Sequence, residues 1–566
     1  MDSTMRFHAT RPTIRSTNGA VSAGHYLAAS AGMRVLARGG NAVDAGVAAG
    51  LCLNVVHNDM CCLSGVAPII LYRADLQRVF SVAGVGTWGE AIDRSLLREK
   101  YSATPMEWPD NTVVPAALDA WITVLRDHGT LSFAEVCQPA LEYAEDGYPM
   151  GEFQRRCIAK YLETYREWEE NRRVFLRDGD VPSPGERIVQ KDLARTLGRF
   201  CQVEAKRASQ GRKAALTALR DHFYKGPIGR ELVAYGQKVG SVLSESDFAR
   251  FEVRYEPPLK VSFRGLDVYG CGPWSQGPVL LQALQLLNTL DPATLRVLNG
   301  DAVHFTIESL KAAFWDRAAF YGDPQFVDVP MQQLLSRAYA EQRASVFDIN
   351  AAHEAYPSPS IEDVLRVPAD EMADTSYVAV MDRHGNIFSA TPSDGYSSGG
   401  MCPGLGLHLS ERGAQGGFDQ EDPNRIEPLK RPRLTPNPSL ILRNGEAHMA
   451  IGTPGNDRQP QAMLQVLLNL VLYGATPQEA VEAPRFAAYG FPASTHPHHV
   501  FPNRVYVEED YPGAISEGLA AKGHDVQRWP ARDWQAGGVC VIRRSDSQGV
   551  FESAADPRRD GYAIGM

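Results

Sequence analysis

Apolar residues at helical spacing form the first clear pattern along the chain. Between positions 24 and 38, Leu27, Ala31 and Val35 recur every four residues and share one face of a helix. The run stops at Gly39-Gly40, where glycine can adopt the left-handed conformation that ends many helices. The pattern predicts a helix over 24–38.

More helices are expected in the sequence that follows. Asn41 is suited to cap a second helix over 42–55, whose small apolar residues favour a buried position against a sheet. The region from about 100 to 255 is also helical in character. Its charged segments, such as 160–173, carry aromatic and leucine residues at spacings that fit packed amphipathic helices. We expect this region to be scaffold.

The pattern changes to β after an acidic, proline-containing stretch at 351–374. Its prolines interrupt any regular element, so we predict an exposed linker there. Beyond it, the short runs 376–381 and 387–391 are β-prone and flank a turn at 382–386. These features predict a hairpin directly after the linker.

A second hairpin is expected further on. Residues 439–442 and 448–451 flank Asn444-Gly445, and an Asn-Gly pair readily adopts the positive φ angles of a hairpin turn. A helix from about Arg458 to Tyr473 follows. Strands that come after a helical half and before further helices indicate an α+β fold built in layers.

Composition and charge narrow the function classes. The chain has 57 basic and 67 acidic residues without a long block of either sign, so nucleic acid is not an expected partner. Residues 1–20 hold no apolar stretch of signal-peptide length, and the most apolar window, 42–56, is too short to span a bilayer. We therefore expect a cytoplasmic protein that does not bind membranes. The nine cysteines form no CxxC pair, which favours reduced structural thiols.

The junction between the linker and the first hairpin is the leading candidate for chemistry. Thr375 lies where the predicted linker, which ends at Asp374, meets the first β-prone run, which starts at Ser376. A threonine hydroxyl is a weak nucleophile that needs a neighbouring base. If the chain is cut before Thr375, the freed α-amine, with a reference pKa of about 7.7–8.0, supplies that base. The alternative interpretation is ordinary β-propensity of threonine at a strand start.

A glycine-rich turn, 452–457, lies between the predicted strand ending at Ile451 and the following helix. Its backbone N–H groups would point outward at the positive end of a helix, which suits an anion or a developing oxyanion. The alternative is a tight turn with an Asn or Asp cap. No Gly-Lys-Ser/Thr follows, so a phosphate-binding loop is disfavoured.

Two other motifs are poor candidates for sites. Residues 84–89 match a dinucleotide-binding glycine pattern, but no βαβ unit with a suitably spaced acidic residue surrounds them. The histidines of 496–499 lie in a proline-rich stretch without carboxylate or thiolate partners at metal-ligand spacing, so we interpret this stretch as a surface loop.

Several motifs together resemble the γ-glutamyltransferase family, which includes cephalosporin-acylase-like and oxamate-amidohydrolase-like members. The similarity spans nearly the whole chain. It is carried by the segments 28–32, 38–45, 273–278, 374–377, 430–432, 452–455 and 555–561. The motif Leu409-Ser410-Glu411-Arg412-Gly413 looks closer to the acylase and amidohydrolase branch.

The resemblance implies a four-layer αββα sandwich and autocatalytic cleavage before Thr375. It implies a large piece 1–374 and a small piece 375–566 that stay together as a heterodimer, with further dimerisation left open. By position, Ser393 matches the residue that hydrogen-bonds the nucleophile. Gly455 and Asn456 match the two residues whose backbone N–H groups form the oxyanion hole, and asparagine tolerates positive φ better than most residues.

The substrate side departs from the family pattern. γ-Glutamyl enzymes use an arginine to hold the glutamyl carboxylate. The matching segment of this chain, 83–87, has a neutral residue in its place. The acid pair that binds the α-ammonium in those enzymes is absent from the matching segment, 411–415. Of the two positions where the family has serines, Thr435 keeps a hydroxyl and Leu434 does not. An acidic acyl group could be held from another direction by Arg412, Arg431 or Arg433.

These observations predict an autoprocessed threonine amidohydrolase or acyltransferase that cleaves a small acyl amide through an acyl-enzyme ester. No metal and no organic cofactor are expected. One alternative is a γ-glutamyltransferase or glutathione hydrolase with a rearranged carboxylate pocket. An alternative from another class is an uncleaved, inactive relative that acts as a binding protein.

Overall fold

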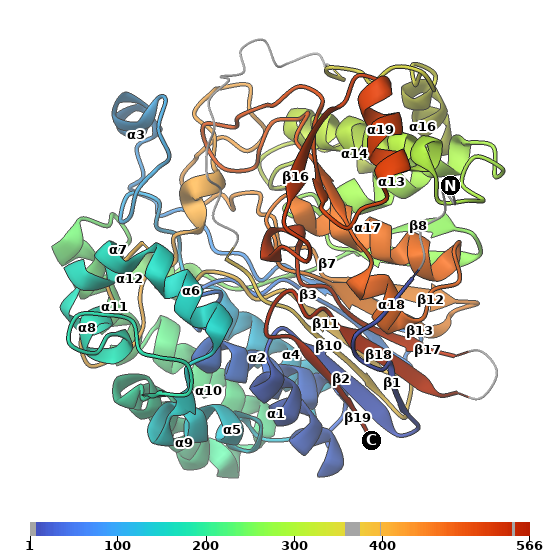
Figure 1. The fold of residues 1–566 in the computed structure, drawn as a ribbon. Helices are drawn as coiled ribbons and strands as arrows, with labels where there is room; N and C mark the ends of the chain where they lie inside the picture. The colour runs from blue at the N-terminus through green and yellow to red at the C-terminus, as the bar shows by residue number, and fades with distance from the viewer. Residues whose placement is uncertain (1–6, 357–373, 397, 546–548) are drawn as a thin grey trace.

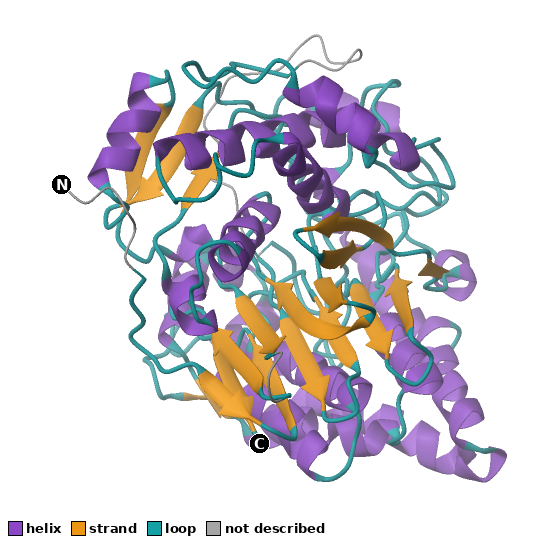
Figure 2. Ribbon diagram, turned by 90° about the vertical axis from the view of Figure 1, so that its right-hand side faces the viewer, coloured by secondary structure: helices purple, strands orange, loops and turns teal. Residues whose placement is uncertain are grey.

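Two antiparallel sheets form the centre of the molecule, and helices cover the outer face of each (Figures 1 and 2). The computed structural model describes residues 7–356, 374–396, 398–545 and 549–566. The predicted four-layer αββα fold is confirmed.

Each central sheet has seven strands within the described residues. In order, the first sheet contains β1 (Ile14–Ser16), β18 (Phe551–Ala555), β17 (Cys540–Arg544), β13 (Glu446–Gly452), β12 (Ser439–Arg443), β9 (Leu266–Gly270) and β8 (Leu259–Phe263). The second contains β19 (Tyr562–Gly565), β2 (Gly19–Ala23), β10 (Val378–Asp382), β11 (Ile387–Ala390), β3 (Ile69–Arg73), β4 (Arg78–Val82) and β7 (Tyr255–Glu256). Their inner faces pack together, with β10 and β11 against β13.

The helices form two outer layers with buried apolar faces. Against the second sheet and on one another lie α1 (Tyr26–Ala37), α2 (Ala42–Val56), α4 (Ala117–His128), α5 (Phe133–Asp146), α9 (Lys191–Arg207) and α10 (Arg212–Tyr224). The other layer contains α13 (Gly277–Thr289), α14 (Gly300–Phe320), α17 (Arg458–Val471) and α18 (Pro477–Glu482).

Shorter elements complete the structure around the sandwich. The remaining helices are α3 (Arg94–Tyr101), α6 (Glu152–Lys160), α7 (Leu162–Glu167), α8 (Glu169–Phe175), α11 (Pro227–Val239), α12 (Glu245–Arg250), α15 (Met331–Leu334), α16 (Arg337–Ala344) and α19 (Gly513–Ala521). The 3₁₀ turns are η1 (Ala208–Gln210), η2 (Arg412–Gln415) and η3 (Trp534–Ala536). Two small sheets pair β5 (Tyr148–Pro149) with β6 (Arg187–Ile188), and β15 (Arg504–Glu508) with β14 (Phe486–Ala488) and β16 (Asp525–Trp529).

The local predictions agree with these elements. The first predicted helix is α1, and Asn41 caps α2 through a capping box with Asp44. Both predicted hairpins are confirmed, because β10 pairs with β11 and β12 pairs with β13. At the turn of the second hairpin, Asn444 and Gly445 have φ values of 53° and 81°.

Strands from both sides of position 375 alternate within the sheets. In the second sheet, β2 lies between β19 and β10 and pairs antiparallel with both. In the first sheet, β12 pairs with β9. The predicted division into 1–374 and 375–566 therefore runs through both sheets. Most of the predicted linker, 357–373, lies outside the described residues.

The prediction of a surface loop at 496–499 is wrong. His496 and His499 are only 7% and 8% exposed. The Nε2 atom of His496 lies 2.8 Å from the carbonyl oxygen of Tyr101, which ties this stretch to the end of α3. Long-range packing of this kind leaves no trace in local composition.

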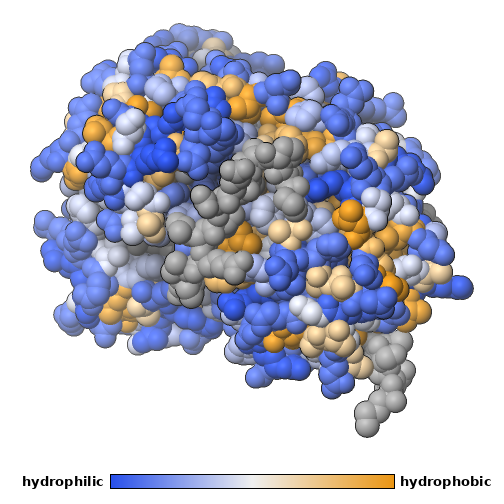
Figure 3. Space-filling model, turned by 90° about the horizontal axis from the view of Figure 1, so that it is seen from above, coloured by the Kyte–Doolittle hydropathy of each residue, from blue (hydrophilic) through white to orange (hydrophobic). Residues whose placement is uncertain are grey.

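The glycine pattern at 84–89 has a packing explanation. A Cβ atom on Gly86 would lie 1.8 Å from the carbonyl oxygen of Val114, so the close approach of two backbones requires glycine there. Hydrophilic residues predominate on the face seen in Figure 3, with smaller hydrophobic groups between them. Within the described residues, no helix is both long and apolar enough to cross a membrane.

Candidate active site

Thr375 lies at the entrance to β10, a strand inside the second sheet. An antiparallel bridge pairs it with Ser393, which follows β11. The amide of Ser376 donates to the carbonyl oxygen of Pro392 at 2.9 Å, which fixes the register of the two segments. As a result, the Thr375 and Ser393 hydroxyl oxygens lie 2.8 Å apart, and both residues are buried.

The chain is continuous from Asp374 to Thr375, and the carbonyl oxygen of Asp374 is surrounded by donors. The Ser393 hydroxyl donates to it at 2.7 Å and the Arg412 Nη2 at 3.0 Å. The Thr375 hydroxyl also contacts this oxygen. Such donors polarise a carbonyl group and stabilise negative charge that develops on its oxygen.

Arg412, in η2, lies between two buried carboxylates. Its Nη2 is 2.5 Å from the Asp374 carboxylate, and its Nε is 3.9 Å from that of Asp394. Burial lowers the pKa of Arg412, but the two carboxylates outweigh this effect and raise it above the ordinary value. Burial raises the pKa of Asp394, and the nearby Arg412 opposes that shift. Arg412 therefore stays charged.

The turn between β13 and α17 contains two consecutive residues with positive φ, Gly455 and Asn456. Gly455 has a φ of 131° and Asn456 a φ of 52°, so asparagine occupies the left-handed region here. Asp457, at the start of α17, forms an ion pair with the buried guanidinium of Arg317 on α14. This pair anchors the turn from the adjacent helix.

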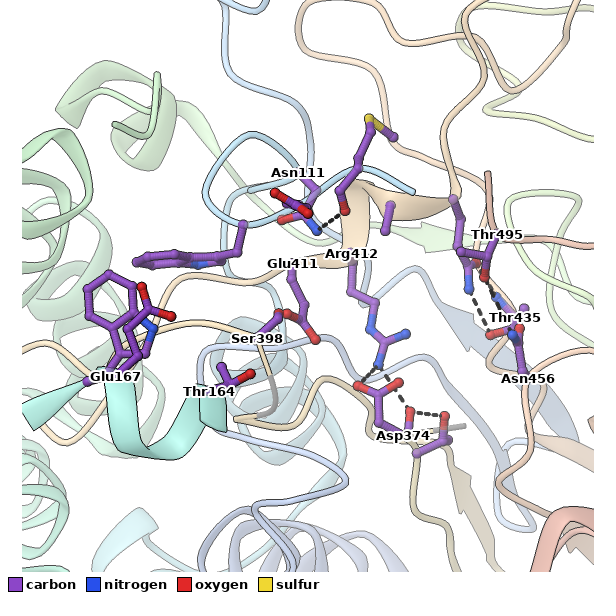
Figure 4. Close-up of a pocket in the computed structure, with 17 residues that line it drawn as sticks. Asn111, Thr164, Glu167, Asp374, Ser398, Glu411, Arg412, Thr435, Asn456 and Thr495 are labelled. Carbon is purple, nitrogen blue, oxygen red and sulfur yellow. Dashed lines mark hydrogen bonds and ion pairs between the residues drawn. The ribbon is translucent and has the colours of Figure 1, made fainter. Parts of the chain in front are cut away.

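Thr375 is one of the residues that line a cavity of about 520 Å³. This volume is within the usual size range of small-molecule sites, and Figure 4 shows the cavity. Asp374, Arg412, Thr435, Asn456 and Thr495 are among the polar residues that line it. The indole rings of Trp108 and Trp168 also line it, with their centroids 5.1 Å apart in an edge-to-face arrangement. The cavity thus combines a polar region beside Thr375 with an aromatic wall.

Of the three candidate substrate-binding arginines, only Arg412 lines this cavity. Arg431 forms ion pairs of 2.7 Å with Asp323 and with Glu256. Arg433 is buried, and its Nη1 donates to the carbonyl oxygen of Arg317 at 3.2 Å. Both are bound to other partners and neither lines the cavity, so the structure does not bring them to the candidate site.

Thr435 lines the cavity, and Gln415 holds it in place. The Thr435 amide donates to Gln415 Oε1 at 3.1 Å, and Gln415 Nε2 donates to the Thr435 hydroxyl at 3.3 Å. The segment 83–87, expected near the substrate, instead contributes Ala83, Val85 and Thr87 to a separate cavity of about 230 Å³.

Two groups of side chains within the described residues have the spacing of metal ligands. The first comprises Asp374, Asp394 and Glu411, and the second His304, Glu308 and His524. The cation of Arg412 lies among the first group. In the second group, His304 and His524 hydrogen-bond each other at 2.9 Å, and the ammonium of Lys311 lies 2.9 Å from Glu308. Protein partners therefore already occupy ligand atoms in both groups.

Sequence reasoning missed several groups around Thr375. It did not identify the Asp374 carboxylate, the Asp394 carboxylate or the aromatic wall as parts of the site. Asp394 has a φ of 96°, a conformation that is strained for a residue other than glycine and is often found at functional sites. The Ser393-Asp394-Gly395 run directly after a predicted strand was the available signal.

Comparisons with known proteins agree with this architecture. The sequence profile described as gamma-glutamyltranspeptidase matches residues 28–566. The glutathione hydrolase-like YwrD proenzyme of Bacillus subtilis (strain 168) is 32% identical, over 98% of this chain and 99% of that protein. The acylase ACY 1 proenzyme of Pseudomonas sp. (strain SE83) is 30% identical, over 99% and 96%.

A solved structure extends the likeness to three dimensions. The cephalosporin acylase from Bacillus halodurans superimposes with a TM-score of 0.86 at 26% identity, covering 100% of this chain and 99% of that one. The match extends over both sheets and both helical layers. The chain belongs to the gamma-glutamyltranspeptidase family and is an N-terminal-nucleophile amide hydrolase or acyltransferase.

Proposed function

We propose that this chain cuts itself between Asp374 and Thr375 and then hydrolyses a small acyl amide through an ester on Thr375. The main support for the proposal is the 2.8 Å contact between the Ser393 hydroxyl and the hydroxyl of Thr375, which lines the 520 Å³ cavity. Nucleophile, orienting hydroxyl and substrate space are thereby adjacent.

In the self-cleavage step, the Thr375 hydroxyl oxygen attacks the carbonyl carbon of Asp374. The C–N bond breaks, the amine of Thr375 gains a proton, and water hydrolyses the resulting ester. Ser393 and Arg412 both donate to the carbonyl oxygen that carries the developing charge. One donor of this kind contributes about 2.7–4 kcal/mol in other acyl-transfer enzymes.

In turnover, the free α-amine of Thr375 takes the hydroxyl proton as the oxygen attacks the substrate carbonyl. The amides of Gly455 and Asn456 stabilise the oxyanion, and their positive φ values support this role. The leaving amine takes the proton, and water or an acceptor amine then releases the acyl group from the ester. Thr435 and Arg412, which line the cavity, contact the substrate.

Replacement of the nucleophile tests this proposal. Thr375→Ala is expected to remain one 62.1-kDa band on a denaturing gel and to lose hydrolysis of acyl p-nitroanilides. Thr375→Ser keeps a hydroxyl and should still be cut, though more slowly. Hydrolysis retained by the uncut alanine variant would remove Thr375 and its amine from the mechanism.

A second candidate is γ-glutamyl transfer, which the 32% identity to a glutathione hydrolase-like proenzyme favours. Its marker is glutamate release from γ-glutamyl-p-nitroanilide that glycylglycine accelerates. A third candidate is an uncleaved relative that acts as a binding protein. It would be supported only if wild-type protein stayed uncut on a denaturing gel and hydrolysed none of the amides. The two-piece protomer, its further dimerisation and the cytoplasmic location remain predictions.

A further inference from the structure

Asp374 lines the polar part of the cavity in the uncut chain (Figure 4). Its carboxylate accepts from the Gly395 amide at 3.0 Å and from Arg412 Nη2 at 2.5 Å. The same Arg412 nitrogen donates to the Asp374 carbonyl oxygen at 3.0 Å. One guanidinium group therefore binds both ends of a short unit that starts at the reacting carbonyl and ends in a carboxylate.

Arg412 has a second counter-ion besides Asp374. Its side chain is 8% exposed, and the Asp394 carboxylate lies 3.9 Å from its Nε. Asp394 itself accepts from the Ser410 hydroxyl and from the Glu411 amide. Loss of Asp374 after the cut would remove the nearer counter-ion of a buried cation, and a buried charge without a partner is unfavourable.

We propose that Arg412 and the Gly395 amide form a carboxylate subsite, which Asp374 occupies before cleavage and the acyl group of the substrate occupies afterwards. This inference rests on the proposed function of Thr375. It assigns the substrate to the monoamides of short dicarboxylic acids, and it means that Asp374 occupies the carboxylate position of the substrate site in the uncut chain.

The covalent structure of Asp374 sets the expected length of the acyl group. Two carbon atoms separate its carbonyl carbon from its carboxyl carbon, as in a succinyl group. The ester formed during self-cleavage carries Asp374 on Thr375, so this residue is the first acyl group that the nucleophile bears. Glutaryl and γ-glutamyl groups place three carbon atoms between carbonyl and carboxylate and fit the same contacts less well.

A substrate series on cleaved wild-type protein tests the inference. Succinyl-p-nitroanilide is expected to exceed butyryl-p-nitroanilide in kcat/KM by about 10- to 100-fold, since the two differ in the charge-assisted contact. The glutaryl compound should fall between them. Equal values for succinyl and butyryl would overturn the carboxylate subsite while leaving Thr375 as nucleophile. Cleaved protein that hydrolyses none of the three would overturn the proposed function, and the subsite with it.

Inhibition gives a readout that does not depend on self-cleavage of a variant. Free succinate should raise the KM for the butyryl compound in wild-type protein, whereas butyrate at the same concentration should not. Absence of any difference between them would contradict the subsite.

Variants assign the effect to Arg412. Arg412→Gln should abolish succinate inhibition in whatever fraction is cut, and Arg412→Lys, which keeps the charge, should weaken it. Arg337→Gln, at an exposed pair on α16, is the matched control and should leave inhibition unchanged. Full inhibition in cut Arg412→Gln would assign succinate binding to another site.

Discussion

Ser393 contacts both partners of the proposed self-cleavage. Its hydroxyl oxygen lies 2.8 Å from the Thr375 hydroxyl oxygen and 2.7 Å from the Asp374 carbonyl oxygen. A hydroxyl group has one proton to donate. If Ser393 donates it to the carbonyl oxygen, the Thr375 proton goes either to Ser393 or to the same carbonyl oxygen, which the Thr375 hydroxyl also contacts.

Ser393→Ala should slow self-cleavage by about 100-fold or more, because it removes one donor to the developing oxyanion. The rate can be followed as the loss of the 62.1-kDa band on denaturing gels. Ser393→Thr restores the hydroxyl and is the matched control. Cleavage of the alanine variant at the wild-type rate would exclude Ser393 from the reaction.

Asp59 is a buried carboxyl group whose titration affects the fold. Burial raises its pKa from 3.8 to about 7. The folded protein thus keeps this proton up to about pH 7, whereas the unfolded chain releases it near pH 4. The stabilising contribution of Asp59 is present below the unfolded pKa and is lost as the pH rises through that window.

The stability of Asp59→Asn relative to wild type should therefore increase as the pH is raised from 4.5 to 7.5, because only the wild type loses the Asp59 contribution. The measurement is the urea midpoint of unfolding at both pH values. Asp75→Asn is the control, because a hydrogen bond from Arg73 lowers the pKa of the exposed Asp75, so this carboxylate is ionised in both states over the tested range and its effect should not change with pH. If the difference in urea midpoint between Asp59→Asn and wild type is the same at both pH values, the raised pKa of the buried Asp59 is contradicted.

At the scale of elements, close packing of α2 on the second sheet places Thr375 and Ser393. The helix lies across β10 and β11, the strands next to these two residues. Gly46 allows that approach, since a Cβ atom there would lie 2.1 Å from the Phe388 ring. The glycine is favourable in α2 although glycine is a poor helix former.

Gly46→Ala should destabilise the protein by about 1–3 kcal/mol, because overpacking outweighs the gain in helix propensity. Gly198→Ala, in α9, is the matched control. A Cβ atom there would have no heavy atom within 4 Å, so the change should stabilise by about 0.5–1 kcal/mol. Urea unfolding measures both, and equal effects of the two substitutions would contradict the packing argument.

At the scale of the whole molecule, the two expected pieces share both sheets. β2 from the first piece pairs with β19 and β10 from the second, and β12 from the second pairs with β9 from the first. Separation of the pieces would break these ladders and expose both sheet faces. Hydrogen bonds and apolar burial both oppose it.

The cut protein should therefore elute in native size-exclusion chromatography at the position of the uncut Thr375→Ala protein. The same fractions should give two bands on a denaturing gel. Release of the 375–566 piece without denaturant would contradict the interleaved arrangement. Urea titration should show that dissociation coincides with unfolding.

Short stretches of sequence were enough to predict many elements of the fold. The helical spacing at 24–38, the Asn-Gly turn at Asn444-Gly445 and the run that begins at Ser376 each reflect backbone preferences of a few consecutive residues. Such preferences survive in the folded state because tertiary packing reinforces them. The buried stretch at 496–499 shows where they fail, because its environment comes from residues far away in the chain.

The sequence by itself determined the layered α+β class, the family and the position of the candidate nucleophile, since repeated spacings and motifs encode these. Only the tertiary structure decided which charges meet at the site. It brought Arg412 to Asp374, set Trp108 beside Trp168, and directed Arg431 and Arg433 to other partners. The physical reason is that side-chain direction and long-range contact depend on how the layers pack, and no local pattern records that packing.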